Sequence, residues 1–177
     1  MDLGLGRPGD GPGVWVLLSY RVPREPSAPR IAIWRKLKRL GVGQLGDGLV
    51  ALPADARTRE LLEWVAEEVS EAGGSAGIWL ARPATAAQER ELAAAMAAAR
   101  AAEYAAVVNQ ATAASDADAA GRAVALRRLR AELRRITRRD YFPPAEREQA
   151  RAATEALAGP QDTRPGGVPA AAAGERP

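Results

Sequence analysis

The spacing of apolar residues predicts a first strand followed by a first helix. The apolar run at residues 14–18 has the length of a buried strand and is too short to cross a membrane. The pattern breaks at residues 21–26 and then takes helical spacing, and Gly41 stands where a left-handed helix end costs least. The apolar positions of this helix are Ile33, Trp34, Leu37 and Leu40. We expect Trp34 to face the core with the others.

The next segments predict a hairpin, a second helix and a last strand. Residues 42–45 and 49–52 flank an Asp-Gly turn, which supplies the positive φ that a tight hairpin needs. Asp55 is placed to cap a helix that the pair Gly73-Gly74 ends. Its apolar positions are Leu61, Leu62, Val65, Val69 and Ala72. Residues 76–81 predict a short strand, in which we expect Trp79 to pack in the core, whereas Trp15 and Trp64 could be partly exposed.

The predicted order is therefore βαββαβ, which is typical of an α+β fold of the ferredoxin-like class, over residues 14–83. An α-helical extension is predicted for residues 84–157. It begins with a long Ala-rich helix, and a second helix starts at Ser115-Asp116. Val124, Leu126, Leu129, Leu133 and Ile136 form the expected apolar seam of that second helix, and Pro144 can open a third. Residues 1–13 and 158–177 are rich in Gly, Pro or Ala without periodicity, so both ends are expected to be disordered.

The composition excludes several kinds of chemistry. The chain has no Cys and no His, so it has no thiol nucleophile, no disulfide and no Cys/His zinc site. No cofactor is expected. The first residues lack the apolar core of a signal peptide, so a cytoplasmic protein is the default expectation.

Positive charge is concentrated in two segments. Residues 14–52 carry seven basic side chains against two acidic ones, and residues 122–140 carry eight Arg against two acidic ones. Such segregation suggests a surface that faces a polyanion such as DNA, in which cations contact backbone phosphates. The candidate DNA-binding residues are Arg21, Arg24, Arg30, Arg35, Lys36, Lys38, Arg39, Arg128, Arg135 and Arg139.

Each basic segment also has a plainer explanation. The charges of residues 21–39 could form a solvated helix face, since runs of charge usually do. Some of the arginines between Arg127 and Arg139 could pair with the acidic helix of residues 60–71. The sequence leaves DNA contact and internal pairing equally open for this second segment.

Three separated motifs resemble a known family. The run WVLLSYRVPREPSAPRIAIWRKLKRLG, then LGDGLVALP with ELLEWVAEEVSEAGGSAGIWLA, and finally LRRLRAELRRITRRDYFP resemble the N-terminal domain of the chromate resistance protein ChrB. The first half is also similar to the middle domain of PaaX-type repressors, which in turn resembles the ferredoxin-like nucleases of CRISPR adaptation. The resemblance to ChrB implies a transcriptional regulator that binds promoter DNA of a chromate-efflux operon and releases it when chromate appears.

The chain departs from these relatives in two ways. Longer family members continue into a domain associated with the chromate response, whereas this sequence ends in a Pro/Ala/Gly tail, which puts chromate sensing by this chain in doubt. The related nucleases place an acidic metal ligand at the end of the first strand, where this chain has Ser19-Tyr20-Arg21. We therefore expect no enzyme activity, no catalytic residues and no metal site.

The partners expected from this interpretation are double-stranded DNA and a second copy of the chain, with which it could form a homodimer. No membrane partner is expected. Chromate is a tetrahedral dianion, and the Arg-rich turn at residues 21–30 could bind it. The alternative function is an interaction module that does not bind DNA and pairs with a separate chromate-response domain.

Overall fold

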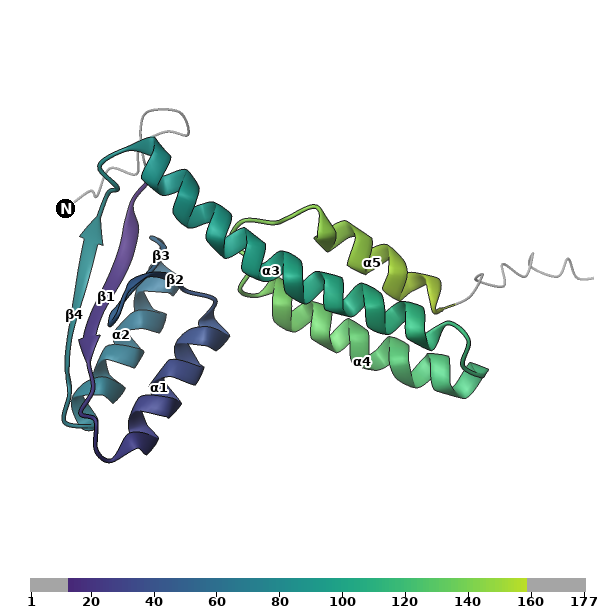
Figure 1. Ribbon diagram of the computed structural model, residues 1–177, viewed down its shortest axis with the longest axis horizontal. Helices are drawn as coiled ribbons and strands as arrows, with labels where there is room; N and C mark the ends of the chain where they lie inside the picture. The colour runs from purple at the N-terminus through teal and green to yellow at the C-terminus, as the bar shows by residue number, and fades with distance from the viewer. Residues whose placement is uncertain (1–12, 159–177) are drawn as a thin grey trace, which may run out of the picture.

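The computed structural model describes residues 13–158 (Figure 1). The predicted disordered ends therefore lie, apart from Gly13 and Ala158, outside the described residues. In chain order the elements are β1 (Trp15–Arg21), α1 (Ser27–Leu40), β2 (Gly43–Gly46), β3 (Leu49–Pro53), α2 (Ala56–Glu71), β4 (Ser75–Ala81), α3 (Ala86–Ala114), α4 (Ala119–Thr137) and α5 (Glu146–Ala156). The mixed α+β class predicted from the sequence is confirmed.

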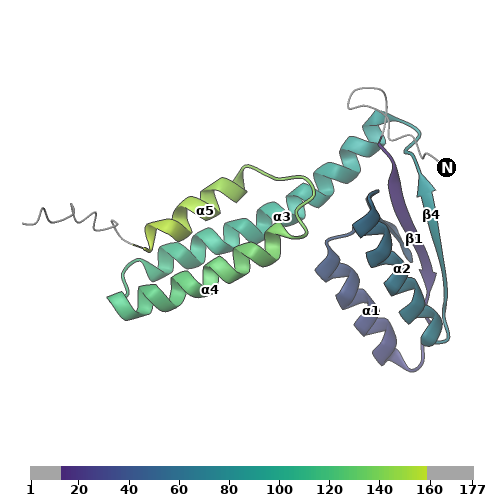
Figure 2. The same cartoon turned by 180° about the vertical axis from the view of Figure 1, so that it is seen from behind.

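The four strands form one antiparallel sheet in the order β2-β3-β1-β4. Helices α1 and α2 lie side by side along one face of it (Figures 1 and 2). Val16 and Leu18 of β1 are fully buried in one cluster with Leu37 of α1 and with Leu62 and Val65 of α2. Alternate strand positions point to opposite faces, so Leu17 and its neighbours Ala51 and Trp79 lie on the other face, called the open face below.

Three local signals in the sequence fix the ends of these elements. Gly41 ends α1 with φ +75°, and Gly48 completes the hairpin turn with φ +72°. The carboxylate of Asp55 accepts a hydrogen bond from the amide of Thr58 at 2.6 Å, and Thr58 Oγ1 accepts one from the amide of Asp55 at 2.9 Å. This capping box satisfies amides that helix geometry leaves unpaired at the start of α2.

Helix α3 contributes to two cores. Near its start, Met96 is buried in the cluster of the sheet and Leu92 packs against that cluster. Further along, Tyr104 and Val107 belong to a second cluster, which also contains Leu129 of α4 and Ala150 of α5. Helices α3, α4 and α5 thus form a separate layer, and the long helix α3 connects this layer to the sheet (Figure 1).

Two tryptophans are not where the sequence analysis placed them. Trp34 is 53% exposed and Trp79 is 61% exposed, so the expectation that both pack in the core is wrong. The buried stripe of α1 is Ile33 and Leu37, and Trp34 lies about 100° round the helix from Ile33. Trp79 lies on the open face, where its Nε1 donates a hydrogen bond to Ser19 Oγ at 3.1 Å.

Of the two tryptophans expected to be partly exposed, one is and one is not. Trp64 is half exposed, whereas Trp15 is only 3% exposed. The Trp15 ring stacks on Phe142 with a centroid distance of 5.8 Å, and its Nε1 donates to Glu89 Oε1 at 3.1 Å. Phe142 comes from the loop after α4, so this burial depends on a contact distant in sequence.

The expected start and seam of α4 also need correction. The helix is capped by Asp118, whose carboxylate accepts from the amide of Gly121 at 2.7 Å, and not by Ser115-Asp116. Val124 is exposed, and the small side chain of Ala125 takes the buried position in its place. Leu129 and Ile136 are buried as predicted, and Leu126 and Leu133 pack against them.

Candidate nucleic-acid interface

The outer side of α1 presents exposed cations around an exposed tryptophan. Arg30, Arg35, Lys38 and Arg39 are all exposed, and none of them forms an ion pair with a residue of the described chain. The ammonium group of Lys38 lies 5.5 Å from the centre of the Trp34 ring, within the range of a cation–π contact. These residues, called the α1 cationic face below, form a surface whose charge no carboxylate within residues 13–158 neutralises by an ion pair.

Lys36 differs from its neighbours on α1. It is half buried and pairs with Glu68 of α2. It thereby joins the two helices that cover the sheet, so its charge is already compensated. Among the candidate residues of α1 it is the one with an evident structural role.

The arginines of residues 122–139 do not pair with the acidic face of α2 among the described residues, so the internal pairing that the sequence left open has other partners than the one suggested. Their partners are Glu132 for Arg135, Glu103 of α3 for Arg139 and Glu155 of α5 for Arg130. The reason is geometric: α4 lies against α3 and α5, and only its end reaches α2. Internal pairing thus neutralises three of the arginines and leaves Arg127, Arg128, Arg134 and Arg138 without a carboxylate partner in residues 13–158.

A pocket of about 400 Å³ lies where the end of α1, the start of α2 and the end of α4 meet. Three hydrogen bonds to main-chain oxygens hold this junction. Arg57 Nη2 donates to the carbonyl of Arg138 at 3.0 Å, Arg139 Nη1 to that of Lys38 at 3.4 Å, and the Tyr141 hydroxyl to that of Leu40 at 3.4 Å. The pocket, called the arginine pocket below, is lined by Arg39, Leu40, Arg57, Leu61, Glu132, Arg135, Arg138, Arg139 and Tyr141.

The arginine pocket has an excess of positive charge. Glu132 compensates Arg135, and Glu103 compensates Arg139 from outside the pocket. The other three guanidinium groups, those of Arg39, Arg57 and Arg138, have no carboxylate partner in the described chain. Such a site favours an anion, and guanidinium groups are suited to phosphate oxygens.

A second cationic hollow adjoins the first. It has a volume of about 710 Å³, lies between α4 and α5, and is lined by Arg130, Leu133, Arg134, Thr137, Arg138, Arg147, Arg151 and Glu155. Arg130 Nε donates to Glu155 at 3.0 Å; this hydrogen bond raises the pKa of Arg130 and lowers the pKa of Glu155. Because Arg138 lines both hollows, the α1 cationic face, the arginine pocket and the α4–α5 hollow form one connected surface, called the cationic track below.

The structure brings together only part of the predicted set. Arg39, Arg135 and Arg139 meet in the arginine pocket. Arg21 and Arg24 line a different hollow, beside Gly73 and Gly74, near the start of α1. Arg128 is exposed on α4 but lines neither hollow of the track.

Three arginines of the track are not among the residues predicted from the sequence, and Arg130, Arg134 and Arg138 belong to the second basic segment but not to the predicted DNA-binding set. The missed residues are Arg57, Arg147 and Arg151. Arg147 and Arg151 are four residues apart, a spacing that places them on one side of α5 and could have been noticed. Arg57 lies in the first turn of α2 with Arg59, outside the two basic segments, so the charge pattern of the sequence did not mark it.

A buried polar network stabilises the joint under the arginine pocket. The guanidinium of Arg100 pairs with Glu103 at 2.9 Å, and Glu103 also pairs with Arg139. Burial lowers the pKa of Arg100. The hydroxyl of Tyr104 donates to Asp140 at 2.9 Å, and burial raises the pKa of Tyr104. The network fixes how α3 and the end of α4 meet, and so fixes where Arg138 and Arg139 lie.

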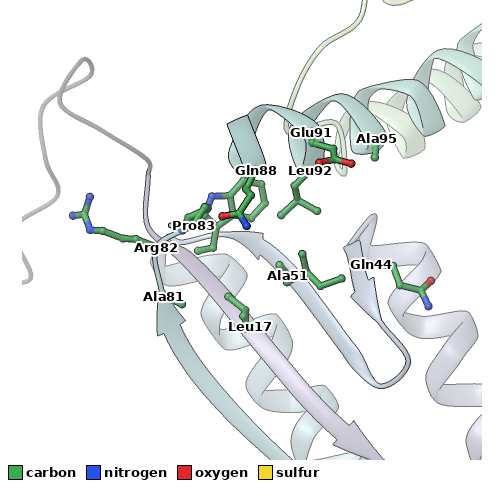
Figure 3. A pocket seen from close by; sticks show the side chains of 12 residues that line it. Leu17, Gln44, Ala51, Ala81, Arg82, Pro83, Gln88, Glu91, Leu92 and Ala95 are labelled. Carbon is green, nitrogen blue, oxygen red and sulfur yellow. The ribbon is translucent and has the colours of Figure 1, made fainter. Parts of the chain in front are cut away.

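A third cavity is of a different kind. It has a volume of about 480 Å³ and lies between the open face of the sheet and the first turns of α3 (Figure 3). Leu17, Ala51 and Leu92 line it, and the polar side chains at its rim include Gln44, Gln88 and Glu91. No group of three or more His, Cys, Asp or Glu side chains that could hold a metal ion occurs within residues 13–158.

Over residues 13–158, no helix is both long enough and apolar enough to cross a membrane.

Comparison with known proteins identifies the family. The model of the family described as "Protein ChrB, N-terminal" matches residues 30–162, which include α1 from Arg30 onward, the hairpin, β4 and the helices α2 to α5. No curated protein and no solved structure matches the chain. The matched range covers most of the chain and contains the arginine pocket entirely. The chain therefore belongs to the family of the N-terminal domain of ChrB, a chromate-resistance protein.

Proposed function

We propose that this chain is a cytoplasmic regulator that binds double-stranded DNA at the promoter of a chromate-efflux operon. The observation that carries the proposal is the cationic track, in which the uncompensated arginines of α1, α2 and α4 meet in one pocket. A surface of this kind suits a polyanion, because each phosphate it neutralises releases condensed counterions. Family membership supports the connection with chromate resistance.

The proposed fold is a ferredoxin-like domain with a helical extension. The element order βαββαβ over β1 to β4 supports it, as does the position of β1 and β3 at the centre of the sheet. In this arrangement α1 lies on the outside of the sheet and is free to approach a DNA groove or backbone. The helical extension supplies the second half of the track, because α4 ends beside α1.

The mode of contact that we propose is mainly with the DNA backbone. Guanidinium groups in the arginine pocket are placed to hold phosphate oxygens, and Trp34 with Lys38 offers a flat cationic surface beside them. We propose a binding role without catalysis, since β1 ends in Ser19, Tyr20 and Arg21 and provides no carboxylate for a metal.

A titration of promoter DNA tests the proposal. We expect the double variant R39E/R138E to weaken binding at least about tenfold, because it removes two uncompensated cations and adds two repulsive charges. Lys36 is left unchanged, since K36E would place a carboxylate beside Glu68 and disturb the packing of α1 on α2. The control variant is R90E, because Arg90 is exposed at the start of α3 and lines neither hollow of the track. Arg82 is left unchanged.

The circular dichroism spectrum of each variant establishes that it is folded. If R39E/R138E binds the promoter as tightly as R90E does, the track is not the DNA surface. The same titration with chromate added tests the regulatory part, for which we expect release of the DNA.

A second candidate function is an interaction module that pairs with a separate chromate-response domain. The exposed apolar residues around the third cavity favour it, since Leu45 and Trp79 are 47% and 61% exposed near an apolar hollow. Co-purification with such a domain, together with no salt-dependent DNA binding at low ionic strength, would support this candidate against the first.

A further inference from the structure

The two edge strands of the sheet, β2 and β4, differ in how far they are protected from pairing with another chain. The β2 edge is four residues long, is interrupted by an irregular register between Gln44 and Gly46, and is covered by α3. On the open face α3 packs closely against β2: a Cβ placed on Gly43 would lie 2.6 Å from Leu92 Cδ1 and 2.9 Å from Met96 Sδ. Short, irregular and covered edges are the usual protection against pairing with another chain.

Within the part of the chain that the structure describes, the β4 edge has none of these protections. Its seven residues, SAGIWLA, pair with β1 without interruption and contain no charge and no proline. Trp79 and Leu80, which point to opposite faces of the sheet, are 61% and 45% exposed. A long, regular and apolar edge strand presents unpaired backbone groups that another strand can bind.

We propose that β4 is a dimerisation strand, and that two copies of this chain pair β4 with β4 in antiparallel orientation about a two-fold axis at Ile78. In this register all seven residues find a partner. Trp79 of each copy lies beside Gly77 of the other, and Leu80 lies beside Ala76, so that large side chains face small ones. The two Ile78 side chains meet at the axis on the face covered by α2.

The charge distribution on α2 fits a second copy of the chain. Glu68 pairs with Lys36 and so marks the side of α2 that faces α1. By helix geometry, Arg59 near the start of α2 lies away from that side, toward the β4 edge, where it pairs with Glu63 at 2.7 Å. The two-fold axis places the α2 helices antiparallel, so the start of α2 in one copy, which carries Arg57 and Arg59, lies beside the end of α2 in the other, which carries Glu67, Glu68 and Glu71.

Measurement of the molar mass of the full chain by light scattering or sedimentation, without DNA, tests the dimer. We expect a dimer for the native sequence, and at least a tenfold weaker association for L80K, which puts a charge opposite Ala76 of the other copy. The matched control is V124K, because Val124 has a similar exposure of 57% and lies on α4, away from β4. A native chain that stays monomeric well above micromolar concentration would overturn the proposal, as would equal association of L80K and V124K.

Cross-linking provides a second measurement that does not depend on the folding of L80K. The chain has no cysteine, so I78C introduces a single thiol, which the proposed axis places opposite its own copy. Mild oxidation should give a covalent dimer of I78C and none of V124C. If I78C cross-links no better than V124C, the strand pairing is wrong, whatever the result with DNA.

Discussion

Arg100 and Gly41 are in contact across the joint between α3 and the end of α1. A Cβ placed on Gly41 would lie 2.8 Å from Nη1 of the buried Arg100 side chain, and 2.9 Å from the carbonyl oxygen of Arg139. The same glycine has φ +75°, so it is required both by its backbone conformation and by its neighbours.

We therefore predict that G41A destabilises the protein by about 2 kcal/mol or more, the sum of a left-handed backbone penalty of about 1 kcal/mol and a steric clash. G73A is the matched control, since Gly73 has φ +74° but nothing within 4 Å of the added methyl group. It should cost only the backbone penalty. Urea unfolding of both variants measures the difference, and equal losses would mean that Arg100 moves aside freely.

Replacing Trp15 and Trp34 in turn distinguishes a side chain that stabilises the fold from one that is expected to contact DNA. W15A should lower the free energy of unfolding by about 3–5 kcal/mol, because Trp15 is buried against Phe142. W34A should change stability by less than about 0.5 kcal/mol, because Trp34 is exposed and contacts mainly Lys38. Under the proposed function W34A should nevertheless weaken DNA binding, as a promoter titration can measure. A large loss of stability in W34A would contradict its placement on the surface.

Stability should fall at alkaline pH through the three tyrosines. Burial raises the pKa of Tyr20, Tyr104 and Tyr141 in the folded protein. As the pH rises past the ordinary value of about 10, the unfolded chain loses these protons before the folded protein does, so the free energy of unfolding decreases. Below that pH the contribution is fully present. Denaturant unfolding at a series of pH values up to about 11 measures the slope.

Y104F is the control for this pH dependence. It removes one of the three ionisable hydroxyls, together with the hydrogen bond from Tyr104 to Asp140. The variant should be less stable than the native protein at neutral pH by about 1 kcal/mol, yet lose less on going to high pH. An unchanged slope would show that Tyr104 does not contribute.

The salt dependence of DNA binding should report individual phosphate contacts. If Arg138 holds a phosphate, R138A should reduce the slope of log affinity against log salt by about one, and R90A should leave it unchanged. The measurement is a set of titrations over several salt concentrations. A loss of affinity with the native slope would instead indicate that the side chain of Arg138 holds no phosphate.

The order of elements could be predicted because the signals that fix it are local. Gly41 and the Asp47-Gly48 turn need particular backbone angles, and Asp55 caps a helix three residues from its partner Thr58. Which face of an element is covered depends instead on what lies next to it. The spacing around Trp34 and the short apolar run around Trp79 are compatible with burial, but no helix or strand of residues 13–158 covers those two side chains.

The arginine pocket could not be predicted for a related reason. Arg39, Arg57 and Arg138 are far apart in the sequence, and they meet only because α4 ends against α1 and α2. Local charge density identified Arg39 and its neighbours, but it could not distinguish Lys36, which pairs with Glu68, from residues whose charge stays uncompensated.

The continuity of α3 has a consequence for how the molecule unfolds. Met96 belongs to the core of the sheet and Tyr104, two turns later on the same helix, to the core of the three helices. A helix shared in this way cannot melt in one core without weakening the other, so the two parts should lose structure in a single cooperative transition. A fragment that ends before α3 would leave Gly43 and the β2 edge uncovered, and would lack the helix that makes the sheet and the helical layer one folding unit.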